Sequence, residues 1–191
     1  MTRKPREILP LLAPLEAVHR LLERFDGVII GGVAASILGK PRLTADVDVM
    51  ILLSVDDLPA FLEAAAQEGL EPRIPDALDF ARRHRVLLLR HRESGINVDI
   101  SLGILPFEQE AVERSQVHRI GSIELRLPTP EDFIIFKAVA HRPVDLEDIR
   151  AVIAKHPNLD RERIRRWIQA FAEVLEMPEL WEDIAPLLEE R

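Results

Sequence analysis

The sequence contains no cysteine, which excludes disulfide bonds, thiolate catalysis and zinc–thiolate sites. It also lacks any apolar run approaching the roughly 20 residues that a membrane-spanning helix requires. The first residues, 1–6, are basic, but no apolar block and cleavage site of a signal peptide follow them. These absences predict a cytoplasmic protein that makes no use of a membrane.

Basic residues are fewer than acidic ones, with 25 Lys+Arg against 33 Asp+Glu and a net charge of −8. Coating of a nucleic acid requires many cations to neutralise phosphates, so the acidic balance argues against it. Residues 82–92 are a local exception, with five arginines and no acidic residue. There, Arg90 and Arg92 face the same way on a predicted strand. Two interpretations are open: contact with a tRNA backbone, or protection of an exposed edge strand.

Hydrophobic periodicity predicts an α+β fold in residues 1–128, followed by an all-helical tail in residues 129–191. Strands are expected at 28–30, 45–53, 86–91, 96–102, 118–120 and 123–127. Helices are expected at 8–25, 33–38, 58–67, 108–115, 129–142, 144–155, 161–176 and 179–189. A turn at residues 93–95 predicts a hairpin between two of the strands, and Thr129 is a predicted helix N-cap.

Gly31 and Gly32 stand between the first predicted strand and a short helix. Glycine lets the backbone turn sharply and approach a ligand closely. The helix start beyond it offers unpaired N–H groups and the positive end of a dipole, which suit a phosphate group. The alternative is a turn without a ligand, since paired glycines often serve that purpose alone.

Asp46 and Asp48 lie two residues apart on the second predicted strand and therefore project from the same face. Adjacent carboxylates in an apolar strand repel one another unless a cation or water compensates their charge. Hard oxygen ligands of this kind suit Mg²⁺, which retains waters and recruits substrate phosphates. The alternative is an edge strand with solvated aspartates, although the apolar run 47–53 argues against full exposure.

Asp99 belongs to a strand that alternates strictly between polar and apolar residues, from 96 to 102. If this strand neighbours residues 45–53, Asp99 joins Asp46 and Asp48 at one site. Three carboxylates around a cleft can hold two metal ions, which activate an attacking hydroxyl and neutralise a triphosphate. Considered alone, Asp99 is also compatible with ordinary decoration of a polar strand face.

Together, these residues resemble the DNA polymerase β-like nucleotidyltransferase superfamily. Its pattern is an apolar residue and a glycine pair, then a spacer, then two acidic residues that alternate with apolar ones. Here thirteen residues separate Gly32 from Asp46, and Asp99 corresponds to the third carboxylate. Further segments are similar to the bacterial AbiEii-type toxins and related minimal nucleotidyltransferases: 31–34, 42–46, and 129–132 leading to Lys137, Ala140, Arg142, Asp145 and Asp148. The resemblance covers about residues 28–155.

The resemblance implies a nucleotidyltransferase fold, a small mixed sheet flanked by helices, with the helical tail added to it. It assigns the nucleotide phosphates to Gly31, Gly32, Arg42, Thr44 and Lys137. It assigns two Mg²⁺ ions, with Mn²⁺ as the alternative metal, to the catalytic residues Asp46, Asp48 and Asp99. Asp99 either completes the metal site or acts as the general base.

Two residues depart from the family pattern, because Gly32 stands where many members have Ser, and His141 stands where small residues are common. Two other interpretations of the helical part are open. Lys137 could extend from a surface helix into water, and Arg142, Asp145 and Asp148 could form a structural ion-pair cluster.

The implied activity is transfer of a nucleoside monophosphate from an NTP to a hydroxyl group of a tRNA, a protein or a small molecule. Within the AbiEii-type resemblance, this would make the protein a component of a toxin–antitoxin pair with a cognate antitoxin. Two alternatives remain. One is a non-catalytic nucleotide-binding or antitoxin protein with the same fold, and the other is an antibiotic-modifying nucleotidyltransferase.

Overall fold

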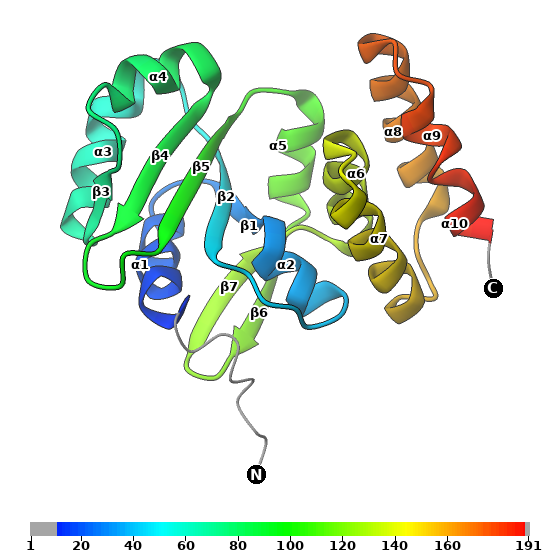
Figure 1. Ribbon diagram of the computed structural model, residues 1–191, viewed down its shortest axis with the longest axis horizontal. Coiled ribbons are helices and arrows are strands. Elements are labelled where there is room, and N and C mark those ends of the chain that lie inside the picture. Colours follow the sequence, from blue (N-terminus) through cyan, green and yellow to red (C-terminus); the bar gives the residue numbers. More distant parts are fainter. Residues whose placement is uncertain (1–10, 190–191) are drawn as a thin grey trace. The chain divides into compact units, whose positions relative to one another are not determined.

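A computed structural model describes residues 11–189 (Figure 1). The elements, in chain order, are α1 (Leu12–Leu22), β1 (Gly27–Ile30), α2 (Gly31–Leu38), β2 (Asp46–Leu52), the 3-10 helix η2 (Val55–Asp57), α3 (Leu58–Gln67), β3 (Leu70–Pro72), α4 (Ala77–His84), β4 (Val86–His91), β5 (Asn97–Gly103), α5 (Pro106–Glu113), β6 (Gln116–Ile120), β7 (Ile123–Leu127), α6 (Pro130–Ala140), α7 (Pro143–Lys155), α8 (Arg161–Leu175), α9 (Glu179–Glu182) and α10 (Ala185–Glu189). The predicted α+β class is confirmed. The predicted start of the first helix at residue 8 lies outside the described residues. Among the described helices, none has the length and apolar character needed to cross a membrane.

The central sheet has five strands in the order β1-β2-β5-β4-β3, and β6 and β7 form a separate antiparallel pair. β2 and β5 run parallel, whereas the other neighbours in the five-stranded sheet are antiparallel. The sheet is therefore mixed, as the resemblance implied. The predicted hairpin is confirmed, because β4 and β5 pair across the turn that contains Gly95, whose φ is +71°.

The core lies on the face of the sheet that carries the apolar residues of β2. Val47, Val49 and Ile51 are almost completely buried. Ile51 and Leu22 of α1 both pack against Gly27 at the start of β1, which places α1 on this face. Figure 1 shows α1 and α3 behind the sheet. Burial of each such side chain contributes about 1.5–3 kcal/mol, so this face fixes the strands in place.

One strand, β3, and one α-helix, α4, are absent from the sequence-based prediction. β3 has three residues and ends in proline, so it is too short to show the alternation of polar and apolar residues that marks a strand. It pairs with β4 and forms the edge of the sheet in its place. The interpretation of the 82–92 arginines as protection of an exposed edge is therefore wrong. Arg90 and Arg92 instead form ion pairs with Glu71 of β3, at 3.3 and 3.4 Å.

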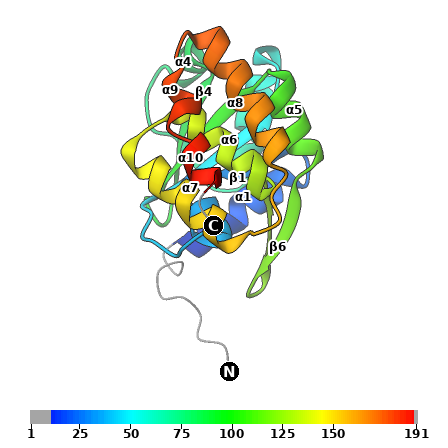
Figure 2. The ribbon, with the colours of Figure 1, turned by 90° about the vertical axis from the view of Figure 1, so that its right-hand side faces the viewer.

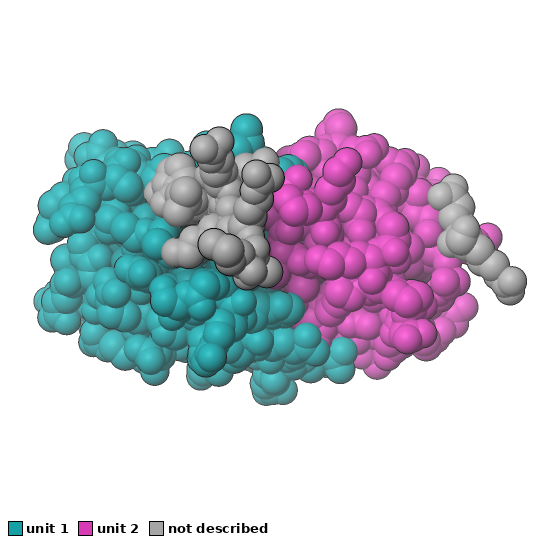
Figure 3. Space-filling view, turned by 90° about the horizontal axis from the view of Figure 1, so that it is seen from below, with its two compact units in different colours: residues 1–33, 42–127 teal, residues 34–41, 128–191 magenta. Residues whose placement is uncertain are grey.

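The chain forms two compact units, coloured separately in Figure 3. The first comprises the residues up to Val33 together with 42–127, and it contains both sheets. The second comprises 34–41 and the residues from Pro128 onward, so it takes most of α2 as well as the predicted helical tail. In this unit α6 packs against α7, α8 and α9 (Figure 1 and Figure 2). Thr129 caps α6, since its hydroxyl accepts a hydrogen bond from the Asp132 N–H, as predicted.

Candidate active site

The strands β2 and β5 bring Asp46, Asp48 and Asp99 to one face of the sheet. Asp48 is the direct partner of Asp99 in the parallel register, and Asp46 is the partner of Asn97. Partner residues in a sheet project from the same face, and all three aspartates are half-buried. The two strands are neighbours, so the condition under which Asp99 joins Asp46 and Asp48 is met, while the chemical roles of the residues stay predictions.

Gly31 begins α2 directly beside Asp48, because Ile30, the last residue of β1, is the strand partner of Asp48. The φ of Gly31 is +64°, in the left-handed region that side chains disfavour. A Cβ atom at this position would lie 2.6 Å from Cγ and 2.7 Å from Cβ of Asp48, which is too close for any side chain. The Asp48 carboxylate therefore packs against the backbone of the glycine turn.

Gly31→Ala is expected to displace the Asp48 carboxylate and to lower nucleotide transfer by more than about tenfold, with a stability loss of about 1–3 kcal/mol. Gly95→Ala is the matched control, because Gly95 also has a left-handed φ, of +71°, but nothing lies within 4 Å of its Cβ position. Urea unfolding and initial transfer rates measure the two effects. Equal losses of activity in both variants would contradict the steric explanation.

Thr44 and Arg42 converge on Gly32, the second residue of α2. The Thr44 Oγ1 donates a hydrogen bond to Oδ1 of Asp46 at 3.1 Å. A Cβ atom on Gly32 would lie 2.7 Å from the Thr44 Cβ and 3.5 Å from Nη1 of Arg42. Glycine at position 32 therefore makes room for Thr44. A hydroxyl group is present at this place although the serine found in many superfamily members is not.

Arg73 belongs to the same face, and sequence reasoning missed it. Its Nη2 lies 2.8 Å from Oδ1 and 3.0 Å from Oδ2 of Asp99. The backbone N–H of Arg73 donates to the Leu88 carbonyl at 3.1 Å, which continues the pairing of β3 with β4 by one residue. Leu88 is in turn the strand partner of Asp99, so the pairing of β3, β4 and β5 places Arg73 in line with this carboxylate.

Burial and two charged neighbours act on the Asp99 carboxylate at this face. Burial raises the pKa of Asp99 above its usual value, and the Asp46 carboxylate adds to the rise, although Arg73 opposes it. Within residues 11–189, no three Asp, Glu or His side chains are placed together so that they could hold a metal ion. The geometry thus places the Asp46 and Asp48 carboxylates on one face, and Asp99 does not form a three-carboxylate cluster with them.

Lys137 lies in the second compact unit, in a buried cluster of charges. Its Nζ is 2.7 Å from Oδ1 of Asp145 and 2.9 Å from Oδ2 of Asp148, and the residue is only 3% exposed. Arg142 also binds Asp145, at 2.7 Å. The interpretation of Lys137 as a side chain extending into water is wrong. Arg142, Asp145 and Asp148 lie in one ion-pair cluster, as predicted, and Lys137 joins them in it. Phosphate binding by Lys137 stays a prediction.

Acid should weaken this cluster. Burial alone would raise the pKa of Asp145, but hydrogen bonds from Arg142 and Lys137 outweigh it, so the pKa lies below the ordinary value of 3.8. A carboxyl group with a lowered folded-state pKa contributes stability above its unfolded pKa, and this contribution is lost as the pH falls through the folded value. The difference in free energy of unfolding between wild type and Asp145→Asn should therefore be smaller at pH 3 than at pH 7, as measured by urea unfolding. An unchanged difference would contradict this assignment, and the exposed Asp79→Asn provides the control.

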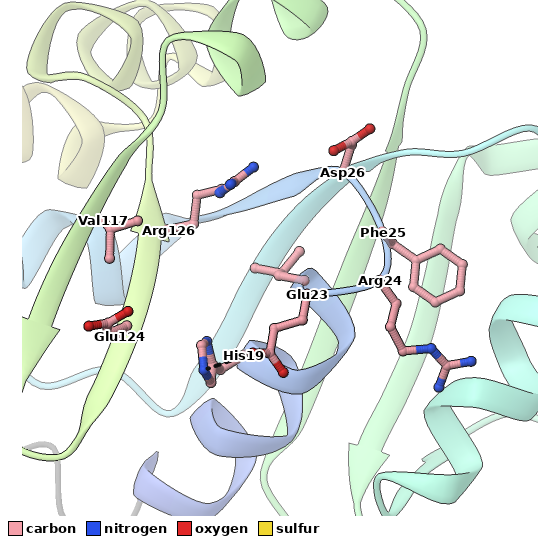
Figure 4. Close-up of a pocket in the computed structure, with 9 residues that line it drawn as sticks. His19, Glu23, Arg24, Phe25, Asp26, Val117, Glu124 and Arg126 are labelled. Carbon is pink, nitrogen blue, oxygen red and sulfur yellow. Dashed lines mark ion pairs between the residues drawn. The ribbon is translucent and has the colours of Figure 1, made fainter.

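A separate pocket of about 360 Å³ lies in the first unit between α1 and the β6–β7 pair (Figure 4). It adjoins the start of β1, at the opposite end of that strand from Gly31. The lining mixes both signs of charge and three apolar residues: His19, Leu22, Glu23, Arg24, Phe25, Asp26, Val117, Glu124 and Arg126. The lining includes none of the predicted site residues, and its mixed charge favours no class of ligand.

The mixed sheet, the glycine turn and the aspartate pair agree with the resemblance to the nucleotidyltransferases. Residues 12–180 match the family described as "Nucleotidyl transferase of unknown function (DUF2204)", and the chain belongs to that family. The match covers both compact units. The narrower resemblance to AbiEii-type toxins stays a prediction. No curated protein matches the chain in sequence.

Solved structures share the fold at low sequence identity. A nucleotidyltransferase-like antigenic protein from Paracoccidioides brasiliensis is 16% identical, with a TM-score of 0.52 over 94% of this chain and 93% of its own. The antibiotic-resistance factor ANT(2'')-Ia is 15% identical, with a TM-score of 0.56 over 87% of this chain and 95% of its own. The Megavirus polyadenylate synthase is 11% identical, with a TM-score of 0.50 over 83% of this chain but 34% of its own. These likenesses establish the nucleotidyltransferase fold.

Proposed function

We propose that this protein transfers a nucleoside monophosphate from an NTP to a hydroxyl group in a Mg²⁺-dependent reaction. The observation that carries the proposal is the packing of the Asp48 carboxylate against the Gly31 turn, with Asp46 on the same face. A phosphate bound at the start of α2 would lie beside two carboxylates. Asp46 and Asp48 are the residues that would hold Mg²⁺, whose contribution would be to neutralise triphosphate charge.

The residues on this face suit in-line displacement. The acceptor oxygen forms a bond to the α-phosphorus, the bond to the bridging oxygen breaks, and pyrophosphate leaves. Gly31, Gly32, Arg42 and Thr44 would hold the phosphates, and Thr44 keeps Asp46 oriented through its hydrogen bond of 3.1 Å. Asp99 would accept the proton of the attacking hydroxyl group. Most of the rate enhancement would come from positioning and charge neutralisation.

The acceptor and the biological role follow from the resemblance to AbiEii-type toxins. We propose a tRNA or protein acceptor and a role in a toxin–antitoxin pair. Arg90 and Arg92 are the residues that would contact an RNA backbone, although both share the carboxylate of Glu71. The shared fold with ANT(2'')-Ia supports a second candidate, modification of an antibiotic by the same chemistry.

A non-catalytic alternative is a nucleotide-binding antitoxin with this fold. The neighbouring genes discriminate between the two roles. A companion winged-helix regulator favours the toxin, whereas a small helical nuclease beside it favours the antitoxin.

The test is incubation of the protein with each α-³²P-labelled NTP, Mg²⁺ and, in separate reactions, total tRNA, a cell lysate or a cationic antibiotic. Label transferred by the wild type and lost in Asp46→Ala supports the enzyme. Binding of an NTP without transfer to any acceptor supports the non-catalytic alternative. Neither transfer nor NTP binding in the wild type would contradict both.

A further inference from the structure

Asp99 is engaged by a cation that belongs to the protein itself. A single nitrogen, Nη2 of Arg73, lies at 2.8 and 3.0 Å from the two carboxylate oxygens. Both side chains are about one quarter exposed, at 24% for Arg73 and 28% for Asp99. The contact at 3.0 Å is a charge-assisted hydrogen bond to Oδ2, whereas the buried Oδ1 accepts no hydrogen bond within the described residues and meets Nη2 as an ion pair alone. A charge-assisted hydrogen bond is about twice as strong as a neutral one, and partial burial lessens competition from water.

The pair is fixed by the fold, because each partner is set by strand register. Asp99 is aligned with Asp48 on one side and with Leu88 on the other. Arg73 follows β3 and hydrogen-bonds to Leu88 through its backbone. The guanidinium group is bonded to the chain, so its charge, unlike that of a metal ion, cannot dissociate from the site.

We propose, on the basis of the proposed function, that Arg73 is a positioning residue that keeps Asp99 out of the metal set. The site then holds one divalent ion, on Asp46 and Asp48, in place of the two ions that three free carboxylates would take. A second dication at Asp99 would lie against the guanidinium group and be repelled by it. Arg73 thus provides a permanent positive charge beside Asp99, in place of the charge that a second ion would bring.

The proposal makes opposite predictions for the two partners. Removal of the Asp99 charge takes away no metal ligand, so metal binding should persist. Removal of the Arg73 charge leaves a carboxylate beside Asp48 without its cation, so metal binding should become stronger. A merely structural ion pair would weaken the protein in both cases and change metal binding in neither.

Mn²⁺ titration followed by electron paramagnetic resonance measures these effects on the full chain. The site-specific ion is the one that Asp46→Asn abolishes. Asp99→Asn should keep it with less than about a threefold change in affinity, whereas Arg73→Gln should bind a second ion or bind the first at least about tenfold more tightly. Arg73→Lys, which retains the charge, should restore the wild-type behaviour. Arg82→Gln, which removes an exposed arginine paired with Asp79 at 3.0 Å, is the matched control.

Loss of Mn²⁺ affinity in Asp99→Asn as large as in Asp46→Asn would overturn the proposal. So would unchanged Mn²⁺ binding in Arg73→Gln. The Asp99→Asn result decides the question by itself if the Arg73 variants do not fold. Wild-type protein without an Asp46-dependent ion would overturn both this proposal and the Mg²⁺ dependence of the proposed function. The expected Mn²⁺ results without any nucleotide transfer would contradict the proposed function alone.

Discussion

Asp48→Asn should lower nucleotide transfer by about 1,000-fold or more, a loss on the order of 4 kcal/mol in transition-state stabilisation. The substitution keeps the shape that packs against Gly31, so it removes the charge and one carboxylate oxygen with little disturbance. Asp46 and Asp99 lie on the same face as Asp48, and their mutual repulsion falls when one of them becomes neutral. The variant should therefore be as stable as the wild type or slightly more stable.

Initial rates of label transfer, with thermal unfolding measured on the same samples, test this expectation. Asp79→Asn is the matched control, because Asp79 lies exposed on α4 and forms an ion pair with the exposed Arg82 at 3.0 Å. The control should retain wild-type activity. A rate for Asp48→Asn within tenfold of the wild type would contradict a central role for this carboxylate, even if the protein remained fully folded.

Lys137→Met should destabilise the protein by about 3–5 kcal/mol, because it leaves buried carboxylates without their shared ammonium group. Asp145 is completely buried and Asp148 is 6% exposed, and both lie within 3 Å of Nζ. Arg142 would still bind Asp145. Asp148 would lose the ammonium group that lies 2.9 Å away, so Asp148→Asn should recover part of the lost stability in the Lys137→Met background.

Urea unfolding of the single and double variants gives the coupling free energy between Lys137 and Asp148. Arg150→Met is the control, since Arg150 forms an exposed pair with Glu147 on the same helix and should contribute no more than about 0.5 kcal/mol. If Lys137→Met unfolds at the same urea concentration as the control, the buried cluster does not stabilise the second unit. A loss of activity without a loss of stability would instead favour phosphate binding by Lys137.

The sequence predicts those features of the site that depend on residues close together in the chain. The alternation around Asp99 and the two-residue spacing of Asp46 and Asp48 fix which face each aspartate occupies, because strand geometry has a period of two. The glycine turn is equally local, since the φ of Gly31 depends on its own residue type. The sequence alone does not predict that these two strands are neighbours. The structure shows that β2 and β5 pair in parallel.

Two other features depend on contacts that no local pattern encodes. Arg73 reaches Asp99 only because a three-residue strand adds itself to the edge of the sheet. Lys137 is buried because the chain turns at His141, with a φ of +50°, and returns as α7 to place Asp145 and Asp148 over it. A lysine on a helix looks alike in sequence whether water or carboxylates surround it. Its surroundings are decided by tertiary packing.

The parallel pairing of β2 with β5 also bears on how the protein folds. The strands are joined through α3, β3, α4 and β4, so they can meet only after a long loop has closed. Non-local pairings of this kind form slowly, because the entropy of loop closure must be overcome before the contacts are made. The aspartates of the candidate site therefore meet late. During refolding, recovery of enzymatic activity should lag behind recovery of helical content, and nascent chains that end before residue 97 would lack a complete site.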